Sequence, residues 1–408
     1  MKTSAAILAL AIASMSAPGF AEQAKPAAQP APAQAAPAGP QPSPKAAAAI
    51  VALEAAVNSH DAAAIAAKTA AAQAVATTPA DRYWIARIQL NGAVMANDLA
   101  AAQQDVDAIA ATNVLPATDL ADIYGKLGGS FLATKKYDQA VANFQRASAL
   151  VPSDTNTIML IARTRAEEGK KAEAATAVQN AIAITKASGA KPTEIMYRNA
   201  VGFAYDAKLP SSVGLAREWL EAYPSDDSWK NALAIYRNLN SGDADNLIDV
   251  SRLAMLTNAM QTANAYEAFA AESIDERNFG EAKAAIDAGI AAGKLQASDS
   301  GVKQLLAATK GQIPTEASLA AAEKSANIPN AFIRVGDRYY AAGNYTKAAA
   351  LYREALAKGA DSSLGNLRLG EALARSGDKA GAAAAFGAVG GSRSDLAKFW
   401  LLYVQSHG

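Results

Sequence analysis

The 408-residue sequence contains no cysteine and only two histidines, His60 and His407. The absence of cysteine excludes disulfide bonds, thiol catalysis and cysteine-ligated metal sites. A histidine-based zinc site or catalytic triad would need more imidazole groups than two residues at opposite ends of the chain can supply. The sequence therefore predicts neither a metal site nor catalysis by cysteine or histidine.

The sequence also lacks a net charge, since 38 basic residues balance 38 acidic residues. Without a strong positive charge, we expect no binding to nucleic acid or to an anionic membrane surface. Alternating β-branched runs that would predict sheet strands are absent, whereas alanine, the best intrinsic helix former, is abundant. We therefore expect an all-α protein.

Two N-terminal segments differ in composition from the rest of the chain. Residues 1–21 combine an early Lys2, an apolar stretch of about thirteen residues and a Gly-Phe-Ala ending, which indicates a secretory signal peptide cut after Ala21. That stretch is too short to remain as a membrane span. Residues 22–43 are rich in Pro, Ala and Gln, and we expect a disordered linker, either a tether or an inert spacer. The mature protein is thus expected to be exported, to the periplasm in a two-membrane bacterium, without a transmembrane segment.

A pattern of small and aromatic residues recurs in the rest of the chain at intervals of 34 residues. Gly336 and Ala348 in one copy correspond to Gly370 and Ala382 in the next. Period-3.6 spacing of apolar residues on both sides of a glycine predicts two helices joined by a tight turn. The pattern is clearest in residues 121–188 and 329–396.

This pattern resembles the tetratricopeptide repeat, in which an aromatic residue, Leu-Gly, Tyr and a later Ala recur in each helix pair. The resemblance implies an all-α, right-handed helical solenoid, with N-terminal repeats in residues 44–240, C-terminal repeats in 241–408 and a capping helix at 395–405. A polar break at 241–246 could be a hinge or a domain seam. The small residues should let paired helices approach closely, and aromatic residues such as Tyr352 and Phe386 should fill the space between neighbouring pairs. Gly343 and Gly377 should end helices with a positive φ.

Other chemical signals in the sequence are weak. Asp243, Asp245 and Asp249 resemble the start of a calcium loop, but the required glycine and closing glutamate are missing, so we expect a solvated turn. The glycines around Gly128 lack the Lys-Ser/Thr ending of a phosphate-binding loop. We therefore predict no catalytic residues and no cofactor.

In the tetratricopeptide family the inner face of the solenoid comes chiefly from the first helix of each pair. Carried over to this sequence, the candidate binding residues are Asn330, Arg334, Asp337, Tyr340, Arg368, Glu371 and Arg375, beside Ile333. The N-terminal repeats would present Asn156, Met159, Arg163 and Glu167. We expect these side chains to be exposed along one concave groove, and the alternative is an ordinary solvated helix face. Gly125 and Gly129 stand where some relatives carry residues that clamp a terminal carboxylate, so that activity is not expected.

The resemblance implies a non-enzymatic exported scaffold that binds an unidentified protein or peptide in this groove by multipoint contact. One alternative is an enzyme subunit or accessory factor in cell-envelope or cell-wall metabolism. Another is a self-associating structural protein. The sequence shows neither a catalytic constellation nor a non-repeat domain large enough to hold one, which favours the scaffold.

Overall fold

The computed structural model describes residues 40–406, and all regular secondary structure in this range is helical. The predicted signal peptide and residues 22–39 of the predicted linker lie outside the described residues. Within residues 40–406, none of the helices combines the length and the apolar character that a membrane crossing requires. The prediction of an all-α fold is confirmed.

The chain divides into two compact units, Met1–Gly169 and Lys170–Gly408. Residues 241–246, where the sequence suggested a seam, lie inside the second unit. The first unit contains α1 (Pro44–Asn58), α2 (Ala62–Val75), α3 (Pro79–Met95), α4 (Leu99–Ala111), α5 (Ala117–Ala133), α6 (Tyr137–Leu150) and α7 (Thr155–Glu167). The second contains α8 (Lys171–Ala187), α9 (Glu194–Asp206), α10 (Ser212–Ala222), α11 (Asp226–Leu239), α12 (Ala244–Leu256), α13 (Ala263–Asp275), α14 (Phe279–Ala291), α15 (Ser300–Thr309), α16 (Glu316–Ser325), α17 (Pro329–Ala341), α18 (Tyr345–Ala357), α19 (Ser362–Ser376), α20 (Lys379–Gly387), the 3-10 turn η1 (Gly391–Arg393) and α21 (Ser394–Ser406).

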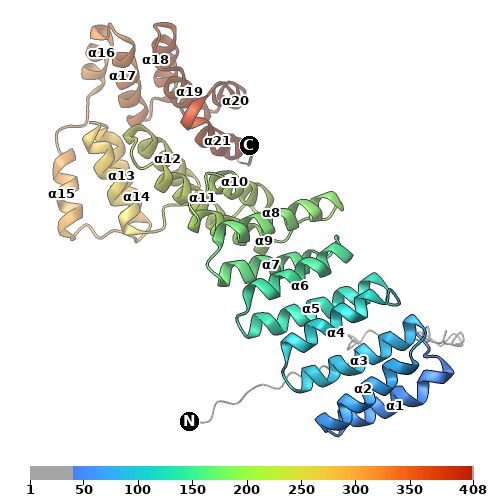
Figure 1. Cartoon of the computed structure of the whole chain (residues 1–408). Coiled ribbons are helices and arrows are strands. Elements are labelled where there is room, and N and C mark those ends of the chain that lie inside the picture. The colour runs from blue at the N-terminus through green and yellow to red at the C-terminus, as the bar shows by residue number, and fades with distance from the viewer. Residues whose placement is uncertain (1–39, 407–408) are drawn as a thin grey trace, which may run out of the picture. The chain divides into compact units, whose positions relative to one another are not determined.

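Consecutive helices pack in pairs (Figure 1). In three of these pairs a glycine of the first helix lies against an aromatic ring of the second. A Cβ atom on Gly128 would lie 2.8 Å from the ring of Phe144. The corresponding distance is 2.6 Å from Gly336 to Tyr352 and 2.5 Å from Gly370 to Phe386. The expected tetratricopeptide-like approach at these glycines is confirmed. The expectation for Tyr352 and Phe386 was incomplete, because each ring lies against the glycine of its own pair.

Tight turns join the paired helices, as the sequence predicts. Gly343 follows α17 with a φ of 78°, and Gly377 follows α19 with a φ of 89°. These are left-handed conformations that glycine adopts without a steric penalty. The predicted role of both glycines as helix ends is confirmed.

The last four residues of the predicted linker are bonded to the first unit. The backbone N–H of Ser43 donates to Asp81 Oδ1 at 2.6 Å, and Trp84 Nε1 donates to the carbonyl of Pro40 at 2.6 Å. Burial alone would raise the pKa of the Asp81 carboxyl, but backbone hydrogen bonds from Ser43, Thr78 and Thr77 hold it well below its usual range. Residues 40–43 therefore belong to the folded first unit.

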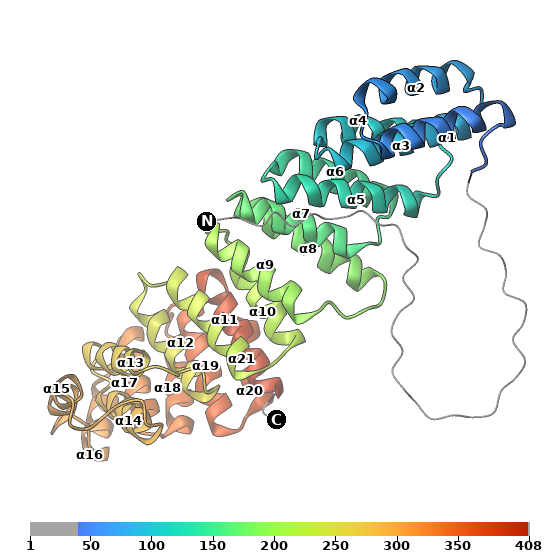
Figure 2. The same ribbon diagram turned by 90° about the horizontal axis from the view of Figure 1, so that it is seen from below.

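The second unit folds back on itself. Its last helix, α21, lies against α10 and α19, as both views show (Figures 1 and 2). The rings of Tyr236 on α11 and Phe399 on α21 are 6.3 Å apart, and Arg217 on α10 pairs with Asp395 at 3.3 Å. Phe399 and Trp400 are fully buried. The helices that end the chain thus complete a core that begins near α10.

A glycine scan of α5 tests the packing inside a pair. Gly128→Ala should destabilise the first unit by about 1–3 kcal/mol, because the new methyl group would overlap Phe144. Gly129→Ala, the matched control with open space around its Cβ position, should instead stabilise it by about 0.5–1 kcal/mol. Hydrogen exchange at the amides of α5 measures both effects.

Phe144→Ala should itself lower stability by about 3–5 kcal/mol and should remove the penalty of Gly128→Ala when the two are combined. A full penalty in the double variant would contradict this packing.

Candidate functional site

Four of the seven predicted binding residues line one hollow of about 350 Å³ in the second unit. They are Asn330, Arg334, Asp337 and Arg368. The hollow lies where α12, the turn between α13 and α14, α17 and α19 meet. Its remaining lining residues are Asp245, Asp275, Glu276, Arg277, Asn278, Ile333, Arg338 and Leu364. We call it the arginine hollow, because four arginines line it.

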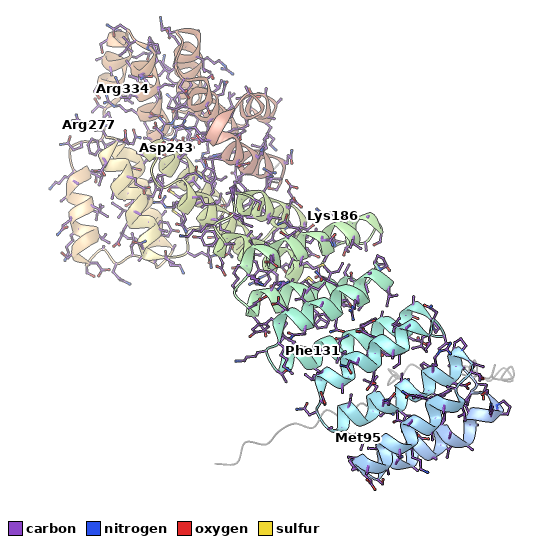
Figure 3. The ribbon with its side chains drawn as sticks, in the orientation of Figure 1. Met95, Phe131, Lys186, Asp243, Arg277 and Arg334 are labelled. Carbon is purple, nitrogen blue, oxygen red and sulfur yellow. The ribbon has the colours of Figure 1, made fainter. Side chains whose placement is uncertain are left out.

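Three arginines of this hollow have no counter-ion among the described residues. Arg334 and Arg338 are four residues apart on α17 and so share one face of the helix, and Arg277 reaches the hollow from the turn after α13. Among residues 40–406, none of the three side chains forms an ion pair or donates a hydrogen bond. Arg277 and Arg334 are exposed, and Figure 3 labels both in the same part of the second unit. The hollow therefore offers three unneutralised guanidinium groups to a ligand.

The backbone at Arg277 is unusual for a long side chain. Its φ of 61° is left-handed, as it is at Lys135 and Lys208 in two other turns. Gly343 occupies the same kind of turn after α17. A non-glycine residue in this conformation costs on the order of 1 kcal/mol, so glycine would fit the turn with less strain. Arginine at this position adds a positive charge to the rim of the hollow.

Acidic side chains interrupt the positive charge. Asp275 and Glu276, on the same turn as Arg277, are exposed and also line the hollow. The surface is therefore a mixed pattern of charges, which discriminates between ligands by the arrangement of their charges.

Four of the predicted groove residues are buried, which corrects the expectation that they are exposed. Asp337 is 5% exposed, Tyr340 6%, Arg368 3% and Glu371 fully buried. The three charged ones among them have partners of opposite charge on α12: Arg252 for Glu371, and Asp245 and Asp249 for Arg368, with Arg252 also 3.9 Å from Asp337. A buried charge needs such partners, since an unpaired one costs several kcal/mol.

Arg368 is bonded to three carboxylates. Its Nη1 donates to Asp337 at 2.8 Å, its Nε to Asp249 at 3.2 Å and its Nη2 to Asp245 at 2.6 Å. Tyr352 donates its hydroxyl to the other oxygen of Asp337 at 2.7 Å. Because Asp245, Asp337 and Arg368 also line the hollow, these contacts form its floor.

A second buried arginine, Arg252 of α12, lies deeper. It donates to both oxygens of Glu281 at 2.7 and 2.9 Å and to Glu371 at 2.9 Å. Its guanidinium carbon lies 4.3 Å from the ring centroid of Tyr340, at cation–π distance. We call the seven charged residues joined in this way the buried charge cluster: Asp245, Asp249, Arg252, Glu281, Asp337, Arg368 and Glu371.

Arg252, Glu281 and Asp249 were not recognised from the sequence as site residues, and the solvated turn expected at Asp243–Asp249 is wrong. Asp243 accepts from the backbone N–H of Asn246 and so caps α12, and it also pairs with Arg393 at 2.9 Å. Asp249 is fully buried within α12. One signal was present: Asp245, Asp249 and Arg252 are spaced by four and three residues, which places them on one helix face.

The buried charge cluster contains more carboxyl groups than guanidinium groups, and two of these carboxyl groups have raised pKa values. Burial raises the pKa of Asp249 to about 6, against the opposing effect of Arg368 and Arg252. Burial and the charge of Asp249 also raise the pKa of Glu371 well above its usual range. Asp249 Oδ2 and Glu371 Oε1 are buried without a hydrogen-bond partner among the described residues. The cluster therefore favours holding a proton in the folded state.

The remaining candidate residues lie elsewhere. Arg375 is exposed and donates to the hydroxyl of Tyr345 at 2.6 Å, outside the arginine hollow. Asn156, Met159, Arg163 and Glu167 belong to α7 of the first unit, where Arg163 pairs with Glu167 at 2.8 Å. Residues 40–406 contain no group of three or more His, Asp or Glu side chains arranged to hold a metal ion.

The raised pKa values predict how the stability of the second unit depends on pH. A carboxyl whose pKa is higher in the folded state binds its proton more tightly there, so its contribution to stability is lost as pH rises from about 4 to about 6. The unfolding midpoint of the second unit should therefore be higher at about pH 5 than at about pH 7.5. Calorimetry at the two pH values measures this difference.

Asp249→Asn should remove much of that pH dependence, because it removes a titrating carboxyl. Asp287→Asn, which changes an exposed residue of α14 outside the cluster, is the matched control and should retain it. Equal pH dependence in the two variants would show that Asp249 is not the titrating group.

Comparison with solved structures finds other helical-repeat proteins. The TPR2AB-domain:pHSP90 complex of yeast Sti1 is 13% identical, with 71% of this chain and 95% of that chain covered and a TM-score of 0.26. A tetratricopeptide repeat protein from Parabacteroides merdae is 12% identical, with 72% and 99% covered and a TM-score of 0.29. The pentatricopeptide repeat protein PPR10 from maize is 14% identical, with 85% and 54% covered and a TM-score of 0.33.

No family model matches the sequence, and no curated protein matches it. Since the structural similarities have low TM-scores, the likeness to tetratricopeptide repeats rests on the 34-residue pattern and on the glycine–aromatic contacts within the helix pairs. Any function has to be argued from the hollow itself.

Proposed function

We propose that this protein is an exported, non-enzymatic scaffold that binds an acidic segment of a protein partner in the arginine hollow. The observation that carries this proposal is the set of three arginines, Arg277, Arg334 and Arg338, that line one hollow and form no ion pair with any residue in the range 40–406. Arginine is suited to this task because its planar guanidinium group forms paired hydrogen bonds with a carboxylate.

The charge pattern narrows the class of partner. Three free cations attract carboxylates, whereas Asp275 and Glu276 on the same rim repel a ligand that is negative along its whole length. A short acidic segment can place its charges between these residues, but a polyanion such as nucleic acid cannot avoid them. The chain has no net positive charge to offset that repulsion. A protein or peptide partner is therefore favoured over nucleic acid.

The floor of the hollow supports a binding role over a catalytic one. Asp337 and Arg368 are held in place by each other and by Tyr352 and Asp249. A rigid floor reduces the entropy lost when a ligand binds. Both charged groups are already engaged in bonds with one another, which leaves them poorly placed to attack or deprotonate a substrate.

Site-specific cross-linking tests the proposal, and the natural absence of cysteine makes the label unique. A photoreactive group attached to Asn330→Cys, which lines the hollow, should capture a defined partner protein in the exported fraction. The same label at Arg353→Cys, an exposed position on α18 outside the hollow, is the control and should not capture it.

Adding Arg334→Glu to the Asn330→Cys protein should lower capture at least tenfold, or about 1.4 kcal/mol. Undiminished capture in that variant would contradict the proposed site. Capture of a second copy of this chain at position 330 would favour self-association instead.

Export is tested separately by sequencing the N-terminus of the mature protein. Cleavage after Ala21 should leave Glu22 as the first residue. An intact Met1 in protein purified from its native cell would contradict the signal-peptide prediction.

A further inference from the structure

We infer that an acidic ligand bound in the arginine hollow is coupled to proton uptake by the buried charge cluster beneath it, so that affinity rises as pH falls. This inference rests on the proposed function and adds a means of regulation to the same site. It depends on two features of the structure: residues that the hollow and the cluster share, and an excess of buried carboxylates within the cluster.

The hollow and the cluster share residues. Asp245, Asp337 and Arg368 line the hollow and are also bonded within the cluster. Arg368 bonds Asp337 and Asp249 with different nitrogens of one guanidinium group, so one planar group connects the floor of the hollow to the buried Asp249. A charge placed in the hollow therefore acts on Asp249 across a buried region in which solvent screening is weak.

The cluster holds more negative than positive charge. From α12 come Asp245, Asp249 and Arg252, from α14 Glu281, from α17 Asp337, and from α19 Arg368 and Glu371. The hydroxyl of Tyr352 on α18 and the ring of Tyr340 on α17 also face the cluster, as does Tyr236 on α11, whose pKa is raised by burial and by the charge of Asp249. Within the cluster two guanidinium groups thus face five carboxyl groups, of which only Asp245 is substantially exposed. Asp245 also pairs with Arg393 of η1 at 4.0 Å, at the edge of the cluster. Such an arrangement is most stable when it binds a proton.

The direction of the coupling follows from electrostatics. A ligand carboxylate held by Arg334 and its neighbours brings another negative charge near Asp337 and Asp249. A like charge raises the pKa of a carboxyl group, so ligand binding draws a proton onto the cluster. Because linkage is reciprocal, a protonated cluster must also bind the acidic ligand more tightly.

One carboxyl group outside the cluster could also titrate between about pH 5.5 and pH 7.5, the range in which unperturbed histidine titrates: burial raises the pKa of Asp105 to about 6, but this residue belongs to α4 of the first unit and does not line the hollow. His60 belongs to α1–α2 of the first unit, and no histidine lines the hollow. His407 lies outside the described residues. A pH dependence over this range would therefore point to the buried carboxyl groups.

The experiment uses the full mature chain and a synthetic peptide rich in aspartate, capped at both ends and labelled with rhodamine. Aspartate has an ordinary pKa of about 3.9, so the peptide keeps its charge throughout the titration. Fluorescence anisotropy at constant ionic strength gives the affinity at about pH 5.5, 6.5 and 7.5. Calorimetry in buffers of different ionisation enthalpy counts the protons taken up on binding.

We expect the affinity to rise at least roughly threefold from pH 7.5 to pH 5.5, with net proton uptake near pH 6. Asp249→Asn should abolish both effects while it retains binding, and Asp287→Asn, the exposed control, should show both. His60→Gln should also show both. If Asp249→Asn does not fold, the proton count in Asp105→Asn decides: uptake that persists in this variant supports the coupling, and its loss would overturn it.

The outcomes separate the two proposals. Binding that Arg334→Glu abolishes but that takes up no protons and does not change with pH would overturn the coupling and leave the binding site standing. Proton uptake that persists in folded Asp249→Asn and disappears in His60→Gln would also overturn it. Absence of any saturable binding that depends on Arg334 would overturn the proposed function and this inference with it.

A further variant distinguishes a binding role from a structural one at the rim. Arg277→Gly removes a guanidinium group and places glycine at a left-handed turn that suits it. It should weaken peptide binding without lowering the unfolding midpoint. A lower midpoint with unchanged affinity would show that Arg277 acts only in the fold.

Discussion

The second unit depends on the pairing of two buried arginines with carboxylates from distant parts of the chain. Arg252 on α12 bonds Glu371 on α19, and Arg368 on α19 bonds Asp249 on α12. Each helix therefore supplies an arginine to a carboxylate of the other. Burying these ions removes their hydration, and the gain from pairing often only offsets that loss. The cluster therefore contributes less to net stability than to specificity. Any other arrangement of these helices would leave buried charges without partners.

The arginine hollow is a consequence of the same cluster. Asp337 and Arg368 neutralise each other in the floor, whereas Arg277, Arg334 and Arg338 line the hollow without a counter-ion in the part of the chain that the structure describes. This division between paired and unpaired charges gives the floor rigidity and leaves the rim free to bind a ligand. It also explains why a hollow lined by many polar residues need not be a catalytic centre.

The sequence predicted features that depend on neighbours within one repeat. The helix pairs, the close approach at Gly336 and the left-handed turn at Gly343 follow from local spacing. It also placed Asn330 and Arg334 together on α17, which the structure confirms for the lining of the hollow. The burial of Arg368 could not be predicted in this way, because its partner Asp249 is 119 residues away. Repeat position specifies which face of a helix a side chain occupies, but only long-range folding decides what covers that face.

The two reciprocal ion pairs between α12 and α19 also limit how this region can change in evolution. In a simple repeat array each pair contacts only its neighbours, so a pair can be duplicated or lost with little effect on the others. Between α12 and α19 such an event would move Arg252 away from Glu371 and leave both ions buried and unpaired. The number of helices in this region is therefore fixed by its electrostatics, and we expect length variation among related chains to be found in the first unit instead.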